Sequence, residues 1–146
     1  ALGAVAAVAA VVALAVGLWA TQVSGDLDEA RLALERERAA AAILADTSAR
    51  SVSLSEGSGR LVVDGEGQAV LVLDDLDPAP AGKTYQMWIV RNAEPVSAGL
   101  FEGRDGVDIA GLEGTVSSGD AVAVTVEKDG GVGAPTSPLV VVSAPI

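Results

Sequence analysis

The sequence contains no cysteine and no histidine. Without cysteine, the chain has no disulfides, no thiolate nucleophile and no cysteine-ligated zinc. Without histidine, it has no Ser–His–Asp triad, no imidazole-ligated metal and no imidazole pH switch. Aromatic residues make up only 3% of the chain, and no basic stripe accompanies them, which argues against nucleic-acid binding. Few routes to catalysis remain.

Basic residues are scarce as well, with nine against 20 acidic residues and a net charge of −11. From Ser51 to the end there are 14 acidic and five basic residues, which gives a net charge of −9. Such a region repels nucleic acid and anionic lipid headgroups, so neither is expected as its partner. The length of 146 residues allows one compact domain plus an anchor.

One long apolar run opens the chain. Residues 1–20 carry no charge and consist of nine alanines, five valines, three leucines, two glycines and Trp19. Twenty helical residues span about 30 Å, the thickness of the hydrocarbon core of a bilayer, and Trp19 suits its interface. We predict a transmembrane helix over residues 1–20; a signal-peptide core and a buried soluble helix are the alternatives. Because the sequence starts at Ala1 and not Met, we expect residues upstream whose charges set the orientation.

Residues 21–49 are predicted to form a helical stalk or linker. Ser24 or Asp26 can cap its helix. Apolar residues then recur at heptad positions, with Glu37 as the interruption; they are Leu27, Ala30, Leu34, Ala41 and Leu44. A solvated stalk, a short coiled coil that dimerises the chain, and a segment cut by a protease are all compatible with this pattern.

From Arg50 onward the apolar period changes from helical to two, the period of half-buried strands. Short runs rich in valine and leucine alternate with turns rich in glycine, proline and aspartate. Eight strands are predicted, at residues 51–55, 60–64, 68–73, 84–90, 96–101, 107–112, 121–127 and 139–143. The fold class is therefore mainly β, with residues 50–146 as an antiparallel Ig-like β-sandwich. A small closed barrel is the alternative.

The pattern offers no catalytic or metal-binding constellation. A serine nucleophile needs a base, and Lys83 and Lys128 both lie in predicted turns where they are hydrated. The carboxylates of residues 74–77 and 105–108 lack the spacing of a calcium loop, so we interpret them as solvated turn residues. We expect no catalytic residue, no cofactor and no metal.

Two further features have ordinary structural explanations. The glycine-rich run at residues 130–133 leads into Pro135 and a strand, whereas a phosphate-binding loop would open a helix. Asp129 before it would also repel a phosphate. Tyr85 and Trp88 could form a platform for a carbohydrate or peptide, but in a domain with so few aromatics we favour a role in filling the core.

The two segments at residues 82–90 and 95–101 carry a family resemblance. They follow the pattern Gly-x-x-Tyr-x-x-Trp and then Pro-Val-x-x-Gly-x-Phe, and the chain resembles the C-terminal domain of the bacterial anti-sigma-K factor family (regulator of sigma K). The matching residues are Gly82, Tyr85, Trp88, Pro95, Val96, Gly99 and Phe101.

The end of the chain is similar to the same family. The strand at residues 122–127 is followed by Gly130-Gly131, Pro135-Thr136 and the apolar run 139–141. Two departures are small: Lys128 stands where proline often follows the glutamate, and Ser137 where glycine is common. The resemblance covers the chain from about Arg50 to its end.

The resemblance implies a membrane-anchored anti-sigma factor. In that family a cytoplasmic N-terminal domain holds an extracytoplasmic-function sigma factor away from RNA polymerase, and regulated proteolysis releases it. This chain would supply the transmembrane helix, the stalk and the extracytoplasmic sensor domain, with the sigma-binding domain missing. A membrane or extracytoplasmic protease is then a partner. The alternative is a membrane-anchored extracytoplasmic binding or assembly module, or an accessory subunit of a membrane complex, which needs no upstream domain.

Overall fold

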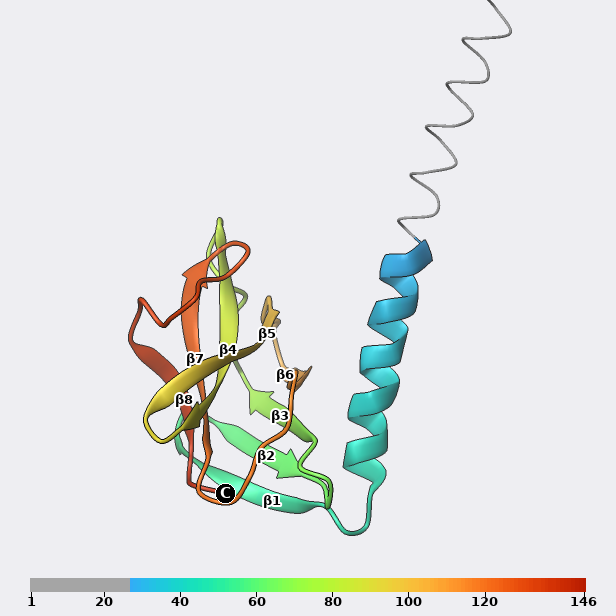
Figure 1. Ribbon diagram of the computed structural model, residues 1–146. Coiled ribbons are helices and arrows are strands. Elements are labelled where there is room, and N and C mark those ends of the chain that lie inside the picture. The colour runs from blue at the N-terminus through green and yellow to red at the C-terminus, as the bar shows by residue number, and fades with distance from the viewer. Residues whose placement is uncertain (1–26) are drawn as a thin grey trace, which may run out of the picture. The chain divides into compact units, whose positions relative to one another are not determined.

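The computed structural model describes residues 27–146 (Figure 1). The predicted transmembrane helix at residues 1–20 and the helix caps Ser24 and Asp26 lie outside these residues. Within the described range, no helix has both the length and the apolar composition needed to cross a bilayer. Residues 27–45 are helical, and eight strands follow.

All eight predicted strands are present, each within two residues of its predicted bounds. The period-two pattern located them because one side of most strands is buried against a common core. The strands are β1 (Arg50–Glu56), β2 (Gly59–Val63), β3 (Ala69–Asp74), β4 (Lys83–Arg91), β5 (Glu94–Phe101), β6 (Val107–Gly111), β7 (Ala121–Lys128) and β8 (Leu139–Ser143).

The strands form one antiparallel sheet in the order β5-β4-β7-β8-β1-β2-β3-β6, so the mainly β class is confirmed and the Ig-like sandwich is not. The reason lies in β1. Residues 50–53 pair with β2, whereas Leu54 and Glu56 pair with β8 across a register shift. One strand thus joins both halves, and the sheet curls as a half-barrel (Figure 1). Near its two edges, the Glu113 N–H donates to the Ala98 carbonyl of β5 at 2.9 Å.

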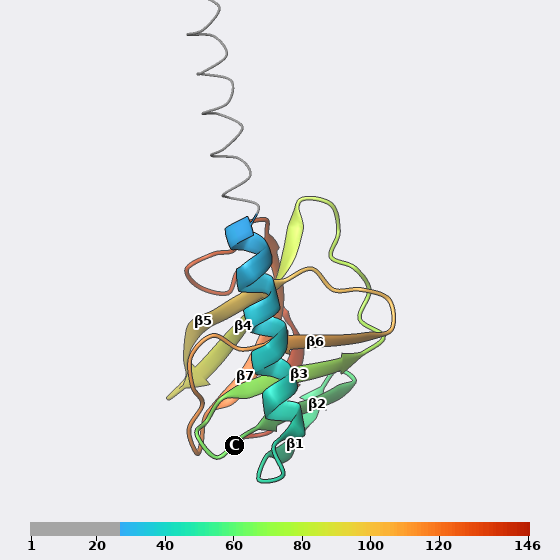
Figure 2. The same cartoon turned by 90° about the vertical axis from the view of Figure 1, so that its right-hand side faces the viewer.

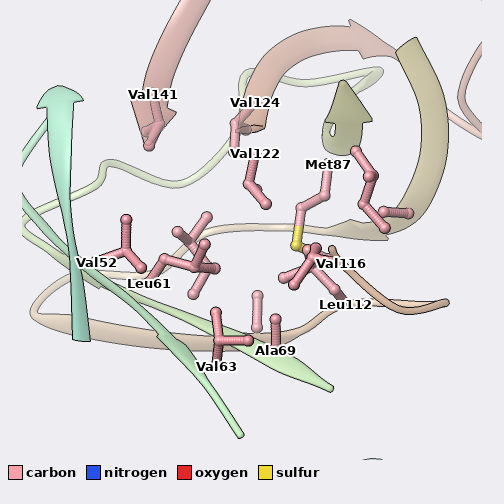
Figure 3. Packing of buried hydrophobic residues seen from close by; sticks show 14 of the residues in the cluster. Val52, Leu61, Val63, Ala69, Met87, Leu112, Val116, Val122, Val124 and Val141 are labelled. Atoms are coloured by element: carbon pink, nitrogen blue, oxygen red, sulfur yellow. The ribbon is translucent and has the colours of Figure 1, made fainter. Parts of the chain in front are cut away.

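The core lies inside this curl. Leu61, Leu71 and Val124 are fully buried there, and Met87 of β4 extends toward Val116 and Leu112 from the opposite side (Figure 3). Both halves of the sheet contribute side chains to one continuous cluster. Because the two halves share this cluster, they are expected to fold and unfold together.

A second, smaller apolar cluster lies on the outer face of β2 and β3. Val62, Val70 and Val72 point away from the core and pack against Ala40 and Ile43 of the helix. Figure 2 shows this end of the helix over β2 and β3. The helix therefore covers an apolar face that the sheet alone would expose to water.

The helical face that packs on the sheet differs from the predicted heptad seam. Leu27, Leu34 and Leu44 are 53%, 44% and 37% exposed, while Ile43 is 9% exposed. Successive helical residues are rotated by 100°, so Ile43 and its neighbour Leu44 point in different directions. The seam remains exposed, and dimerisation through it stays a prediction.

The turn between β4 and β5 adopts an unusual backbone conformation. It contains two residues, Asn92 at φ 51° and Ala93 at φ 65°. Two-residue hairpin turns of type I′ require positive φ at both positions, which asparagine and glycine accept. Alanine in the left-handed region costs about 1–2 kcal/mol, so Ala93 is a strained position.

Replacing Ala93 with glycine should therefore stabilise the protein. We expect Ala93→Gly to raise the free energy of unfolding by about 0.5–1 kcal/mol, because the relief of strain exceeds the entropy that glycine adds to the unfolded chain. Chemical denaturation measures the change. Gly106 is a matched control, since its φ is +91° with open space around it, and Gly106→Ala should destabilise by about 1 kcal/mol. A neutral or lower stability of Ala93→Gly would contradict the assignment of strain.

Candidate functional site

The outer face of β4 and β7 carries the most buried polar groups among residues 27–146. Side chains alternate along a strand, so Tyr85, Met87 and Ile89 enter the core while the residues between them point outward. On that outward side Trp88 and Glu127 are nevertheless fully buried. A covering segment is required, and the loop of residues 129–138, here called the Gly/Pro-rich loop, leads from β7 to β8 (Figure 1).

Glu127 binds the second half of this loop. Its carboxylate accepts the backbone N–H of Thr136 at 2.8 Å and that of Ser137 at 3.3 Å, together with the Thr136 hydroxyl. Thr125 also hydrogen-bonds the carboxylate, and the Trp88 indole N–H donates to the Thr125 hydroxyl at 2.9 Å. A buried carboxylate is stable only when its oxygens are hydrogen-bonded, so Glu127 fixes the position of the loop.

The protonation state of Glu127 follows from two opposing effects. Burial raises the pKa of its carboxyl group, whereas the hydrogen bonds from Thr136, Thr125 and Ser137 favour the charged form and lower it. The hydrogen bonds prevail, and the pKa of Glu127 lies below the ordinary value of 4.5. The network is therefore built around a carboxylate and not a carboxylic acid.

Gln86 binds the first half of the loop. Its amide N–H2 donates to the Val132 carbonyl at 3.0 Å and to the Ser97 hydroxyl at 2.8 Å, and its oxygen accepts the Val132 N–H at 2.9 Å. The side chain thus makes both hydrogen bonds that a neighbouring strand would make. Gly131 fits closely against it, since a Cβ there would lie 3.1 Å from the Gln86 Oε1.

A shallow hollow of about 430 Å³ lies beside this loop. Lys128 is the one ionisable residue of its lining, which also holds Gln86, Ser97, Leu100, Gly130, Gly131, Val132 and Gly133. A second hollow of about 420 Å³ lies along β4 and β5, next to Glu113 and Arg91. Residues 27–146 contain no cluster of three potential metal ligands. Both hollows have the size of ligand sites.

The structure corrects one interpretation of the acidic turns. Asp108 was expected to be solvated, but it is 5% exposed. It accepts the Arg104 N–H at 2.8 Å and the Arg104 Nε at 3.1 Å. Asp74, Asp75 and Asp77 are exposed, as expected of turn residues.

Residues 82–90 and 95–101, the two segments that carry the family resemblance, are here called the signature segments. The first contributes to both faces of β4. Gly82 is the last turn residue before the strand and has φ +74°. Tyr85 lies in the core cluster, stacks on Phe101 with ring centroids 5.2 Å apart, and donates its hydroxyl to the Asp77 carbonyl at 2.9 Å. Trp88 lies on the other face. Both β4 aromatics are therefore buried, which confirms that they do not form an exposed platform, but Tyr85 alone belongs to the core cluster.

The second signature segment forms the edge strand β5. Pro95 pairs with Val90, and Val96 is 61% exposed. Gly99 has φ +112° at a register shift opposite Met87. Such bulges take glycine because only glycine adopts this conformation without strain. Phe101 then returns to stack on Tyr85, so the bulge sets which side of β5 faces the core.

Sequence reasoning missed three buried polar residues, namely Gln86, Asp120 and Glu127. Asp120 is 4% exposed and accepts three hydrogen bonds from Arg91, the shortest at 2.7 Å. The hydrogen bond from Arg91 is the main cause of the lowered pKa of Asp120, opposed by burial. For Glu127 the sequence did offer a signal. This glutamate continues the valine-rich run 121–126, and strand alternation places it on the same face as Thr125.

Comparison with known proteins gives a consistent answer. The family described as "Anti-sigma-K factor rskA, C-terminal" matches residues 4–140. An uncharacterized protein in the phr 5′ region of Streptomyces griseus is 32% identical over 127 residues, 84% of this chain and 53% of that protein. Anti-sigma-K factor RskA of Mycobacterium sp. (strain KMS) is 36% identical over 84 residues, 56% of this chain and 35% of that protein. The chain thus spans about half or less of these relatives. No solved structure matches.

The Glu127 network generates a pH-dependent prediction. Glu127→Gln should lower the free energy of unfolding by about 1–3 kcal/mol at pH 7, because a neutral amide replaces a hydrogen-bonded carboxylate. A lowered folded-state pKa gives stability that is complete above the unfolded value of 4.5 and is lost as pH falls toward the folded value. The difference between wild type and variant should therefore shrink below pH 4.5, as measured by denaturation from pH 7 to pH 3.

Asp129→Asn provides the control, because it removes one negative charge from an exposed position two residues away. This variant should match wild type within about 0.5 kcal/mol at pH 7. An effect of Glu127→Gln that equals the control, or that does not change with pH, would contradict a structural role for the carboxylate.

Proposed function

The chain belongs to the anti-sigma-K factor family, and from this premise we propose that it is the membrane-anchored and extracytoplasmic part of an anti-sigma factor. The observation that carries the proposal is the family match over residues 4–140, which extends from the apolar N-terminal run through seven complete strands into β8. The partner would be an extracytoplasmic-function sigma factor, bound by a cytoplasmic domain upstream of Ala1.

The proposed membrane topology follows from the sequence together with the relatives. Residues 1–20 would span the bilayer, residues 21–49 would form the stalk, and residues 50–146 would form the extracytoplasmic domain. The uncharged length of the first segment supports this assignment. The matched parts cover 53% of the Streptomyces protein and 35% of the Mycobacterium protein, which leaves room in those relatives for a further domain.

The extracytoplasmic domain would act as a sensor and not as an enzyme. Its buried polar side chains support this role, because Gln86, Glu127 and Asp120 make hydrogen bonds within the fold. We propose that the seven signature residues are structural: they shape the β4–β5 hairpin. The domain would transmit its signal through regulated proteolysis of the stalk. The accessibility of the stalk would depend on whatever binds or destabilises the domain.

The first test concerns the N-terminal part of the native protein. The protein should be purified from its own membranes through a C-terminal tag, and its intact mass and N-terminal sequence determined. We expect an extension of about 50–100 residues before Ala1, the size of a small domain, and co-purification of a sigma factor. A native chain that starts within a few residues of Ala1 and binds no sigma factor would favour an extracytoplasmic assembly module instead.

The topology can be tested with a single cysteine, because the sequence given has none of its own. Asp105 is exposed, and Asp105→Cys should react with a membrane-impermeant maleimide when the reagent is added to intact cells. The unmodified protein serves as the control for labelling of any upstream residue. Labelling of Asp105→Cys only after lysis would place the domain in the cytoplasm and contradict the proposal.

A further inference from the structure

The C-terminal part of the helix, residues 38–45, contacts the sheet through very few side chains. Of residues 38–45, Ala40 and Ile43 are buried, and the others are exposed. Their contact surface consists of Val62, Val70 and Val72 on the outer face of the sheet. Figure 2 shows β2 and β3 behind this end of the helix. We call this contact the helix dock. Ile43 is its largest side chain on the helix side, so the dock depends mainly on that residue.

The helix dock is separate from the core of the domain. No residue of the dock belongs to the main core cluster, because Val62, Val70 and Val72 lie on the opposite side of their strands from Leu61, Leu71 and Leu73. Contacts that share no side chains with the core can open without global unfolding. The dock can therefore be lost while the eight-stranded sheet stays folded.

The connection between the dock and the sheet is short and ordered. Asp46 Oδ1 accepts the N–H and the hydroxyl of Ser48, both at 2.8 Å, and the Ala49 N–H donates to the Asp46 carbonyl at 3.1 Å. Ala49 itself packs beside the dock. A connection of four residues keeps the helix near its binding face after release, so the cost of docking again is small.

We propose that the helix dock controls access of proteases to the stalk. With Ile43 seated on the three valines, the backbone of residues 38–49 is held in a helix and an ordered turn, and a protease cannot bind it in the extended form. Without the dock, the helix loses its tertiary support, and helices in water are only marginally stable on their own. The inference rests on the proposed function, and it assigns the regulated step to one apolar contact.

A ligand or stress would act by changing the equilibrium between the docked and released helix. Only a factor that interacts differently with the two states can shift it. The released state exposes Val62, Val70 and Val72 next to Ile109, which is already 44% exposed and pairs with Val72. A partner with an apolar surface would therefore favour release.

The test compares two charged substitutions at adjacent helix positions in the full-length protein. Ile43→Asp places a charge in the dock, whereas Leu44→Asp places the same charge one residue away at a position that is 37% exposed. Both carry the same penalty from the helix dipole, so a difference between them reports the dock when the protease does not require an apolar residue at 43 or 44. The measurement is the rate of cleavage within residues 38–49 by added proteinase K, a protease of broad specificity, with the protein in its native membranes.

We expect Ile43→Asp to be cleaved about 10- to 100-fold faster than wild type, the effect of losing one buried isoleucine and burying a charge. Leu44→Asp should stay within about threefold of wild type. A second variant on the sheet, Val72→Thr, keeps the β-branched shape and should accelerate cleavage about fivefold. Hydrogen exchange of β7 amides should not change in any variant.

Two results would overturn the proposal. One is equal cleavage of Ile43→Asp and Leu44→Asp. The other is loss of β7 protection in Ile43→Asp, since the dock would then be part of the global fold. Expression of the target genes separates this inference from the proposed function: faster cleavage in Ile43→Asp with unchanged expression supports the dock and contradicts signalling through stalk proteolysis.

Discussion

A buried carboxylate imposes the strictest requirement in this structure. Glu127 lies at the end of a valine-rich strand with no exposed atoms, and a charge in that position needs several hydrogen-bond donors at once. The backbone of Thr136 and Ser137 supplies two of them. The Gly/Pro-rich loop must therefore return over β7 before β8 begins, and Gln86 fixes its first half in the same way. The path of ten loop residues thus depends on two side chains.

The curled sheet has two outward regions that need a cover, and the covers differ in kind. Over β4 and β7, the loop is held by hydrogen bonds whose loss would leave buried polar groups unsatisfied, which makes partial opening costly. Over β2 and β3, the helix is held by apolar contacts that have no strict geometry, so the helix can leave and return. The difference in chemistry explains why a rigid structural element and a reversible one can occupy the same small domain.

The sequence predicted the strands well and their assembly less well. Alternation revealed all eight strands because it depends on local burial. It could not show that β1 pairs with β8 as well as β2, since that requires a register shift at Leu54 and a partner about 90 residues away. Likewise, Trp88 was expected in the core. Side chains alternate along a strand, so Trp88, three residues after Tyr85, points to the opposite face of the sheet. The heptad pattern did not reveal that Ile43, on another face of the helix, meets the sheet, because the contact depends on the outer face of β2 and β3.

The position of the helix dock has a consequence for how a signal would travel. The hollow beside the Gly/Pro-rich loop adjoins β4 and β5, whereas the dock lies on β2 and β3, and the two regions are joined by the main core cluster and by the hydrogen bond from the Glu113 N–H to Ala98. Coupling between them would run through that core or that edge contact, and close-packed interiors offer few alternative packings. A ligand at the hollow would then stabilise the domain without moving the helix, and an event at the outer face of β2, β3 and β6 would act on it directly. The outer face is therefore the more effective place for a signal to act.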